Sequence, residues 1–428
     1  MNIAYILNIF PRLYQTFILN DMAHLKRQGH DIYVFSAGKP YDNIFHGDAV
    51  AFSENTVYFS DLVNETMGKV NQYIFKFALR TKKYNPIYEK TIQYIFHEMS
   101  NKGYDKKYFK DLDWRLHALP SVANALIKKE IDVIHAGFGS NESTYAMIMS
   151  EMTRIPFTFE THAKDLFVKF PFADEKIRKA QRLFTISEYN KKYLTEHLRC
   201  PPSKIVVKRV SCNRTYCDQI SLKGRKDNLI LSVCRLDSIK GLEYAIEAFS
   251  KVVRKRNDLK YVIIGDGPLR GDLAGQVERL SLSEKVSFRG NITNEQVLNL
   301  IAQATIVLMP SVIAQNGDRD GIPTALIEAM YMKTPVISSR VSGIPELIDD
   351  GMNGFLTESG DVDQIAGKME RLLSDESLRT RMGDLAREKV DREFNIEDNV
   401  NKLISAWKDI TSEAAGRSNK GTAFQEIV

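Results

Sequence analysis

Short apolar, β-branched runs recur along the chain, and most are followed by a polar loop. Such runs are typical of buried strands in parallel sheets. The first is followed by an amphipathic helix over residues 16–28, which Gly29 ends, and then by a second strand. This strand–helix–strand order predicts parallel sheets with right-handed crossovers. The predicted strands are 3–9, 31–36, 132–138, 156–161, 183–186, 204–210, 229–233, 261–264, 286–290, 304–309, 335–338 and 354–356.

The chain of 428 residues is too long for a single hydrophobic core, so we expect two domains. Residues 219–228 are polar and charged, which predicts a linker between domains at 1–218 and 229–395. Residues 396–414 predict a helix with one apolar stripe that includes Leu403 and Trp407. Residues 415–428 predict a disordered tail.

Residues 304–328 carry the most informative pattern of the chain. A buried strand over 304–309 leads into a loop rich in Gly and Asp, and Pro323 stands where a helix would begin. If Leu326 and Met330 face the core, Glu328 faces a cleft on the other side of the helix. Asp320 lies just before the free N–H groups of the first helical turn, which form an anion site. Two acids around an anion site suit a ligand that carries both phosphate and hydroxyl groups.

This stretch and the residues after it resemble a known family. Residues 320–330 read Asp-Gly-Ile-Pro, four further residues, and Glu-Ala-Met, and residues 335–338 and 343–346 read Pro-Val-Ile-Ser and Gly-Ile-Pro-Glu. The run resembles the retaining family 4 (group 1) glycosyltransferases, in particular the bacterial exopolysaccharide and colanic-acid type. Their Glu-x7-Glu signature has Asp320 in its first position here. The resemblance, strong over 229–354, implies an α/β GT-B fold, with two doubly wound parallel-sheet domains facing across a cleft.

The resemblance implies a donor site for a nucleotide diphosphate sugar, with a UDP-sugar favoured over a GDP-sugar. Arg235 and Lys240 would bind the diphosphate, as a planar fork and as a point charge. The catalytic candidates are Asp320 beside the sugar, Glu328 on the ribose hydroxyls, and His162. Further donor-binding candidates are Gly265, Gly267, Gly321, Ile322, Pro323, Thr324 and Ala325. Cys234 stands where relatives have glycine, and residues 211–213, Ser-Cys-Asn, replace a common Gly-Val-Asp.

Two loops of the N-terminal half supply the remaining candidates. The loop over residues 10–17 resembles the Phe-Pro…Thr-Phe loop of the exopolysaccharide transferases, and its Arg12, Gln15 and Thr16 are acceptor or donor candidates. His162 opens a loop that resembles their His-Ala-x-Asp loop, which makes Lys164 and Asp165 candidates as well. A purely structural histidine and a loop that is polar without a function are the alternatives.

Residues 69–110 interleave ten Lys or Arg residues with ten aromatic residues and only three acidic ones. This pattern suits an anionic membrane surface or a lipid diphosphate, so a lipid-linked oligosaccharide is our expected acceptor. A pair of solvated helices that buries Tyr and Phe on one face is the alternative. Single-stranded nucleic acid would suit the same pattern, but we do not expect it as a partner.

Composition narrows the classes of protein further. The net charge is only +5, and no run of 18 apolar residues exists. We therefore expect a cytoplasmic protein, and peripheral contact with a membrane is a hypothesis. Residues 1–17 predict a first strand and not a signal peptide. Four cysteines without metal-ligand spacing predict reduced thiols. The resemblance implies a metal-independent transfer, so we expect neither a metal nor a cofactor. A nucleotide-sugar 2-epimerase on the same fold and a non-catalytic glycan-binding relative stay as alternatives.

Overall fold

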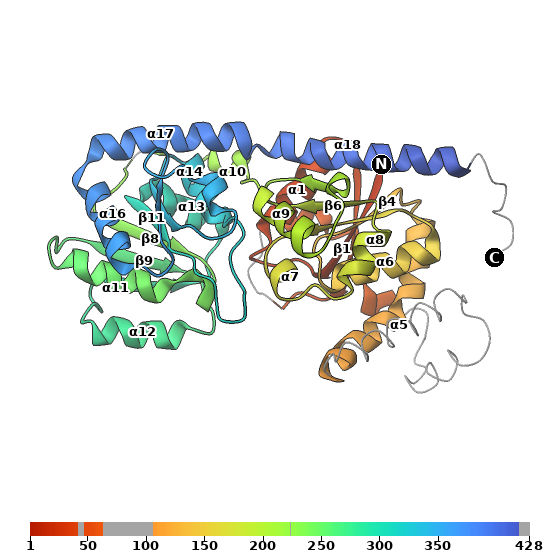
Figure 1. Cartoon of the computed structure of the whole chain (residues 1–428), viewed down its shortest axis with the longest axis horizontal. Coiled ribbons are helices and arrows are strands. Elements are labelled where there is room, and N and C mark those ends of the chain that lie inside the picture. The colour runs from red at the N-terminus through yellow and green to blue at the C-terminus, as the bar shows by residue number, and fades with distance from the viewer. Residues whose placement is uncertain (42–46, 63–105, 223, 419–428) are drawn as a thin grey trace.

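Two parallel sheets, each flanked by helices, form the two lobes of the chain (Figure 1). The computed structural model describes residues 1–41, 47–62, 106–222 and 224–418. Residues 69–105 of the basic aromatic segment, and most of the predicted tail, lie outside the described residues. The predicted α/β architecture of two parallel-sheet domains is confirmed.

The N-terminal sheet has the strand order β3-β2-β1-β4-β5-β6-β7. Its first strand is central, since Ile3 pairs in parallel register with Ile32 on one side and Val133 on the other. The strands are β1 (Asn2–Ile9), β2 (Asp31–Gly38), β3 (Thr56–Tyr58), β4 (Val133–Ala136), β5 (Phe157–Thr161), β6 (Arg182–Thr185) and β7 (Ile205–Val207). The helices are α1 (Thr16–Arg27), α5 (Lys106–Lys128), α6 (Asn141–Thr153), α7 (Lys164–Phe167), α8 (Ala173–Lys179) and α9 (Glu188–His197).

The C-terminal sheet has the order β10-β9-β8-β11-β12-β13, so successive strands are added first on one side of β8 and then on the other, and the strand order reverses between β8 and β11. Its strands are β8 (Leu229–Val233), β9 (Lys260–Ile264), β10 (Val286–Gly290), β11 (Ile306–Met309), β12 (Val336–Ser339) and β13 (Phe355–Thr357). Its helices are α10 (Arg214–Cys217), α11 (Leu242–Val253), α12 (Arg270–Arg279), α13 (Asn294–Gln303), α14 (Thr324–Tyr331), α15 (Ile344–Leu347) and α16 (Val362–Ser374). Ligands of open parallel sheets bind outside the carboxyl ends of strands at such a reversal.

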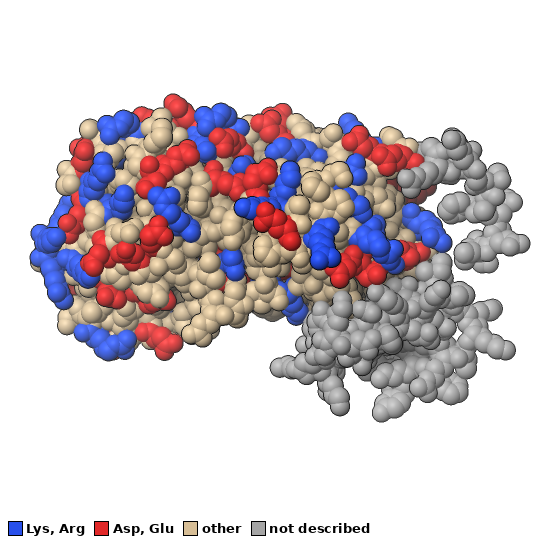
Figure 2. Space-filling model, viewed as in Figure 1, with Lys and Arg blue, Asp and Glu red and all other residues tan. Residues whose placement is uncertain are grey.

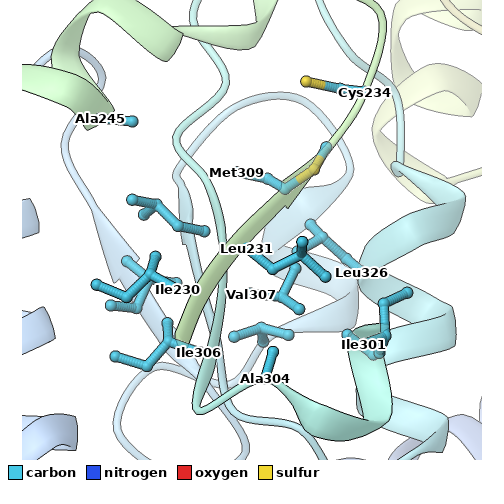
Figure 3. Packing of buried hydrophobic residues seen from close by; sticks show 14 of the residues in the cluster. Ile230, Leu231, Cys234, Ala245, Ile301, Ala304, Ile306, Val307, Met309 and Leu326 are labelled. Atoms are coloured by element: carbon cyan, nitrogen blue, oxygen red, sulfur yellow. The ribbon is translucent and has the colours of Figure 1, made fainter. Parts of the chain in front are cut away.

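Buried aliphatic side chains fix α14 on this sheet. Leu231 of β8, Val307 of β11 and Leu326 of α14 are fully buried and lie together (Figure 3). Because Leu326 and Met330 are both fully buried, the helix has little rotational freedom. Glu328 is therefore held on the side of α14 that faces the other lobe, as the sequence predicts.

Two long helices, α17 (Glu376–Glu393) and α18 (Ile396–Ser418), connect the lobes along one edge of the molecule (Figure 1). The stripe with Leu403 and Trp407 packs in the N-terminal core beside Met22 and Val133. The Trp407 indole N–H also donates to the Thr158 hydroxyl at 3.1 Å. The helix continues to Ser418, beyond the helix end expected at residue 414.

The surface carries charges of both signs. Figure 2 shows Lys and Arg interspersed with Asp and Glu over both lobes on one face. In the part of the chain that the structure describes, no helix is at once long and apolar enough to cross a membrane. The four cysteines are buried and reduced.

Candidate active site

A cavity of about 410 Å³ lies between the two lobes. The residues around it follow the carboxyl ends of β1, β5, β8, β9 and β11, the edge at which parallel sheets place their ligands. The sequence-predicted residues in its wall are Arg12, Gln15, Thr16, His162, Arg235, Lys240, Gly265, Asp320, Gly321, Ile322, Pro323, Thr324, Ala325 and Glu328. The fold thus brings most of the predicted candidates together, although they come from both domains.

The cationic part of the wall follows β8. The side chain of Arg235 is about half exposed, with its Nε 3.9 Å from the Asp237 carboxylate. Lys240 ends a short 3₁₀ turn, and the start of α14 lies in the same wall with Thr324 and Ala325. Two cationic side chains and a helix N-terminus therefore surround one space, a combination that suits a polyanion.

Asp320 and Lys240 form a buried pair in this wall. The Lys240 Nζ donates to Asp320 Oδ1 at 2.5 Å, and the Ser311 hydroxyl donates to Asp320 Oδ2 at 2.6 Å. Burial opposes the charge of Lys240, but the Asp320 carboxylate outweighs it and raises the pKa of the ammonium. Both oxygens of the carboxylate are thus engaged, so Asp320 keeps a fixed orientation before any ligand arrives.

Glu328 lies at the deep end of the wall and is only 7% exposed. Burial raises the pKa of this carboxyl to about 7, and the neighbouring Asn294 side chain only partly opposes the rise. A carboxyl with this pKa changes charge near neutral pH.

The two predicted glycines after β9 serve the packing of the chain itself. Gly265 has φ +121°, and a Cβ there would stand 1.9 Å from the Cys234 carbonyl oxygen. A Cβ on Gly267 would stand 2.4 Å from the Leu236 oxygen, and Gly267 lies outside the cavity wall. These glycines let the loops after β8 and β9 touch, which positions Arg235.

The first loop of the chain closes the cavity from the N-terminal side. Arg12, Gln15 and Thr16 line it, and the Arg12 guanidinium lies 4.4 Å from the centre of the Tyr41 ring. The Tyr14 hydroxyl hydrogen-bonds the Asn291 side chain of the other lobe. The loop therefore touches both walls.

The loop after β5 places His162 in the cavity wall but keeps Lys164 and Asp165 out of it. Asp165 is buried and accepts from the N–H groups of Gly139, His162 and Ala163 at 2.9–3.0 Å. The Lys164 ammonium reaches across to Asp318, 3.4 Å away. Asp165 thus shapes the loop, while Lys164 links the two lobes.

Three further contacts join the two lobes across the cleft. A Cβ on Gly321 would stand 2.4 Å from the Ile186 Cδ1, so a larger residue there would require the Ile186 side chain to move. The Glu346 carboxylate accepts from the N–H groups of Glu188 and Tyr189 at 3.0 and 2.8 Å, at the start of α9. It also pairs with Arg209 at 2.9 Å. A carboxylate of one lobe therefore helps to cap a helix of the other.

Sequence reasoning missed several residues around the cavity. They are Tyr14, Glu160, Asn291, Asn294 and Ser311. Tyr14 and Glu160 have partners across the cleft or far away along the chain, and Asn294 begins a helix that the sequence did not predict. Ser311 lies in the predicted loop, nine residues from its partner Asp320. Within the described residues, no group of three or more His, Cys, Asp or Glu side chains is arranged to hold a metal ion.

Comparison with known proteins agrees with this geometry. Residues 214–389 match the family "Glycosyl transferases group 1". The chain is 26% identical to the putative colanic acid biosynthesis glycosyltransferase WcaL of Salmonella typhimurium, over 95% of this chain and 99% of the relative. It is 38% identical to the amylovoran biosynthesis glycosyltransferase AmsK of Erwinia amylovora, over 46% of this chain and 48% of AmsK.

The fold matches solved structures over almost the whole chain. The structure of Anabaena HepE in complex with UDP and glucose aligns with a TM-score of 0.66 at 15% identity, over 95% of this chain and 99% of HepE. The resemblance to GT-B glycosyltransferases that the sequence predicted is confirmed.

Proposed function

We propose that this chain, whose residues 214–389 match the group 1 glycosyltransferases and whose fold is GT-B, transfers a hexosyl unit from a nucleotide diphosphate sugar to a carbohydrate hydroxyl, with retention at the anomeric carbon. One observation carries the proposal. Arg235, Lys240, Asp320, Glu328 and the start of α14 all face the same cavity of about 410 Å³ between the lobes.

In this proposal the cationic wall stabilises the leaving group. Negative charge grows on the diphosphate as the bond between its oxygen and the anomeric carbon breaks. The proposal assigns this charge to Arg235, Lys240 and the N–H groups of Thr324 and Ala325, since these residues line one cavity. Groups held in place before the reaction stabilise such charge without reorganising, so they lower the barrier.

The two acids bind hydroxyl groups. Glu328 would accept from the ribose hydroxyls, and Asp320, already oriented by Ser311 and Lys240, would accept from the sugar. We propose a UDP-sugar as donor and no required metal, since the cationic side chains balance the diphosphate. The UDP in the HepE structure supports the choice of base.

We further propose that the acceptor is a glycan, either lipid-linked or free, made in the synthesis of an exopolysaccharide or another cell-surface polysaccharide. The names of WcaL and AmsK support this role. The basic aromatic segment over residues 69–110 supports a cytoplasmic location with peripheral contact with the inner face of an anionic membrane.

Thermal unfolding with a panel of UDP-, GDP- and ADP-sugars, with and without EDTA, tests the donor site. We expect one nucleotide class to raise the melting temperature with EDTA present, because a ligand at ~100 times its Kd adds about 2.7 kcal/mol of stability. Arg235→Ala should weaken binding about 10- to 100-fold, the usual effect of losing a charge-assisted hydrogen bond. Arg254→Ala, an exposed position on the same domain, is the control.

Two outcomes would contradict the proposal. Equal shifts with Arg235→Ala and wild type would exclude the cationic wall as the diphosphate site. Conversion of the donor to a 2-epimer without any acceptor would replace glycosyl transfer by epimerisation.

The affinity for the donor should depend on pH through Glu328. Only the carboxylate form accepts hydrogen bonds with both oxygens, and the pKa of this group in the free protein is about 7. Affinity should therefore be constant above about pH 7.5 and fall about tenfold per pH unit below about pH 6.5. Calorimetric titration of UDP between about pH 5.5 and 8.5 measures this. Glu328→Gln should bind more weakly at high pH and lose the slope, whereas an unchanged slope would assign it to another group.

A further inference from the structure

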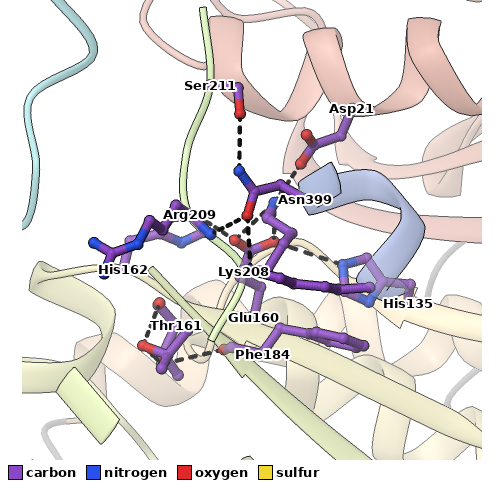
Figure 4. A network of polar contacts seen from close by, with 12 residues as sticks. Asp21, His135, Glu160, Thr161, His162, Phe184, Lys208, Arg209, Ser211 and Asn399 are labelled. Carbon is purple, nitrogen blue, oxygen red and sulfur yellow. Dashed lines mark hydrogen bonds and ion pairs between the residues drawn. The ribbon is translucent and has the colours of Figure 1, made fainter. Parts of the chain in front are cut away.

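A buried network of charged side chains lies directly behind the cavity wall (Figure 4). The Lys208 side chain is fully buried, and its ammonium contacts two carboxylates, Glu160 of β5 and Asp21 of α1. The Nζ–Oε1 distance to Glu160 is 2.9 Å. Buried ions persist only when they are paired, so these three groups depend on one another.

His162 connects this network to the cavity. Its Nε2 lies 3.4 Å from Glu160 Oε1, and its Nδ1 lies 3.8 Å from Asp165 Oδ2. The ring is packed between Phe17 and Phe138, with centroid distances of 4.7 and 4.9 Å. Both ring nitrogens thus face carboxylates, while the aromatic rings fix the plane of the imidazole.

We propose that Glu160 is a positioning residue of the transfer site: together with Asp165, it holds His162 as an imidazolium, so that His162 takes part as a fixed cation and not as a base. This inference rests on the proposed function for its link to catalysis. The charge state itself follows from the contacts of the ring.

The balance of charge around the ring favours protonation. The groups that face it are Glu160 of β5, Asp165 of α7, Asp21 of α1 and Lys208 after β7. These are three carboxylates against one ammonium, so a second cation is needed to compensate the buried negative charge. Burial disfavours the imidazolium, but Glu160 and then Asp165 outweigh it and raise the pKa of His162 to about 9.

His135 provides an internal comparison. It lies farther from the same carboxylate, with 3.9 Å between its Nε2 and Glu160 Oε2, and its Nδ1 is 2.9 Å from the Thr158 hydroxyl. It packs against Tyr5 and Trp407. There burial dominates and lowers the pKa of His135 to about 3. The network therefore keeps one histidine neutral and the other charged.

The consequence for the reaction is direct. An imidazolium has no free lone pair and cannot take a proton from the acceptor hydroxyl. It adds positive charge to the N-terminal wall of a cavity whose opposite wall carries Arg235 and Lys240. His162 would then help to balance the departing diphosphate.

Selective ¹³C labelling of the eight histidines allows the ring of His162 to be titrated by NMR, with His162→Gln to assign its resonance. In the wild type we expect the ring to stay protonated to at least about pH 8, given its pKa of about 9. In Glu160→Gln the midpoint should fall to about 6.5 or lower, because the facing negative charge is gone. A wild-type midpoint below about 7 would overturn the proposal, even if the variant does not fold.

Turnover gives a second readout. If the ring pKa falls from about 9 to about 6.5, the protonated fraction at pH 8 falls about thirtyfold but hardly changes at pH 6. We therefore expect Glu160→Gln to lower kcat about thirtyfold at pH 8 and less than about twofold at pH 6. Glu142→Gln, which also removes a buried carboxyl from this lobe, is the matched control and should show no such pH dependence.

An equal loss of turnover at both pH values would mean that Glu160 is only structural, which would overturn the positioning role. The NMR titration needs neither donor nor acceptor. If the His162 ring titrates as expected but no transfer activity is found, the result counts against the proposed function and not against the charge state of His162.

Discussion

Replacement of Lys240 by methionine is expected to lower kcat by about 10²- to 10³-fold, the usual effect of losing one preorganised group that stabilises charge in the transition state. Methionine keeps most of the apolar length of the side chain but removes the ammonium. The same change leaves the Asp320 carboxylate, only 7% exposed, with the hydrogen bond from the Ser311 hydroxyl but without its cation. Removing one member of a buried ion pair costs on the order of 3 kcal/mol, so stability should fall as well.

A double-mutant cycle separates the two effects. Asp320→Asn combined with Lys240→Met removes the uncompensated charge, so the double variant should recover stability relative to Lys240→Met alone. Its kcat should stay low, because the diphosphate would still lack its cation and the sugar would lose the Asp320 carboxylate, and Asp320→Asn alone measures the second loss. Recovery of kcat together with stability would show that Lys240 serves only to neutralise Asp320.

The surface pair of Lys251 and Asp363, 2.6 Å apart on the same domain, is the matched control. Lys251→Met should leave stability almost unchanged, since exposed pairs contribute little. Its kcat should be that of the wild type. A large loss there would point to a general sensitivity of the domain and not to the cavity.

The sequence predicted the core of the candidate site because its signals are local. The β-branched run before residue 310, the Gly- and Asp-rich loop and Pro323 together specify a strand, a loop and a helix start. Leu326 and Met330 then determine which side of α14 is buried, and so the direction of Glu328. No knowledge of distant contacts is needed for these steps.

Partners across the fold could not be predicted in this way. Glu160 lies in a run that reads simply as a strand, Phe-Thr-Phe-Glu-Thr, and its partner Lys208 is 48 residues away along the chain. No local sequence pattern distinguishes a buried glutamate that pairs with a distant lysine from an exposed glutamate at the end of a strand. The contacts of Asn213 were also beyond local prediction. Its side-chain oxygen Oδ1 caps α10, and its Nδ2 donates to the distant Asp48 carboxylate at 3.1 Å.

Element bounds were predicted less well than element order. The short strand β3 and the helix α6 were not predicted, and β7 ends at Val207, before the predicted end at residue 210. Helix α6 is buried along much of its length, so its apolar residues do not form one stripe with a helical period. The residues after Val207 pair with acids instead: Lys208 with Glu160 inside the N-terminal lobe, and Arg209 with Glu346 of the other lobe.

Gly265→Ala is expected to have the largest effect on stability. The added Cβ would overlap the Cys234 carbonyl oxygen at 1.9 Å, and φ of +121° is unfavourable for any residue with a side chain. Strain and overpacking together should cost about 3 kcal/mol or more, or roughly 6–12 °C in melting temperature for a domain of this size. The loop that carries Arg235 would also shift, so donor affinity should fall in parallel.

Gly367→Ala is the matched control for this prediction. Gly367 lies inside α16, and a Cβ there would meet nothing within 4 Å. Alanine is the better helix former by about 1 kcal/mol, so this variant should be slightly more stable than the wild type and bind the donor equally well. Thermal unfolding and UDP titration of both variants decide the matter. If Gly265→Ala keeps wild-type stability, the close approach of the loops after β8 and β9 does not constrain the domain. The role of Gly265 would then be contact with the donor, as the family resemblance implies.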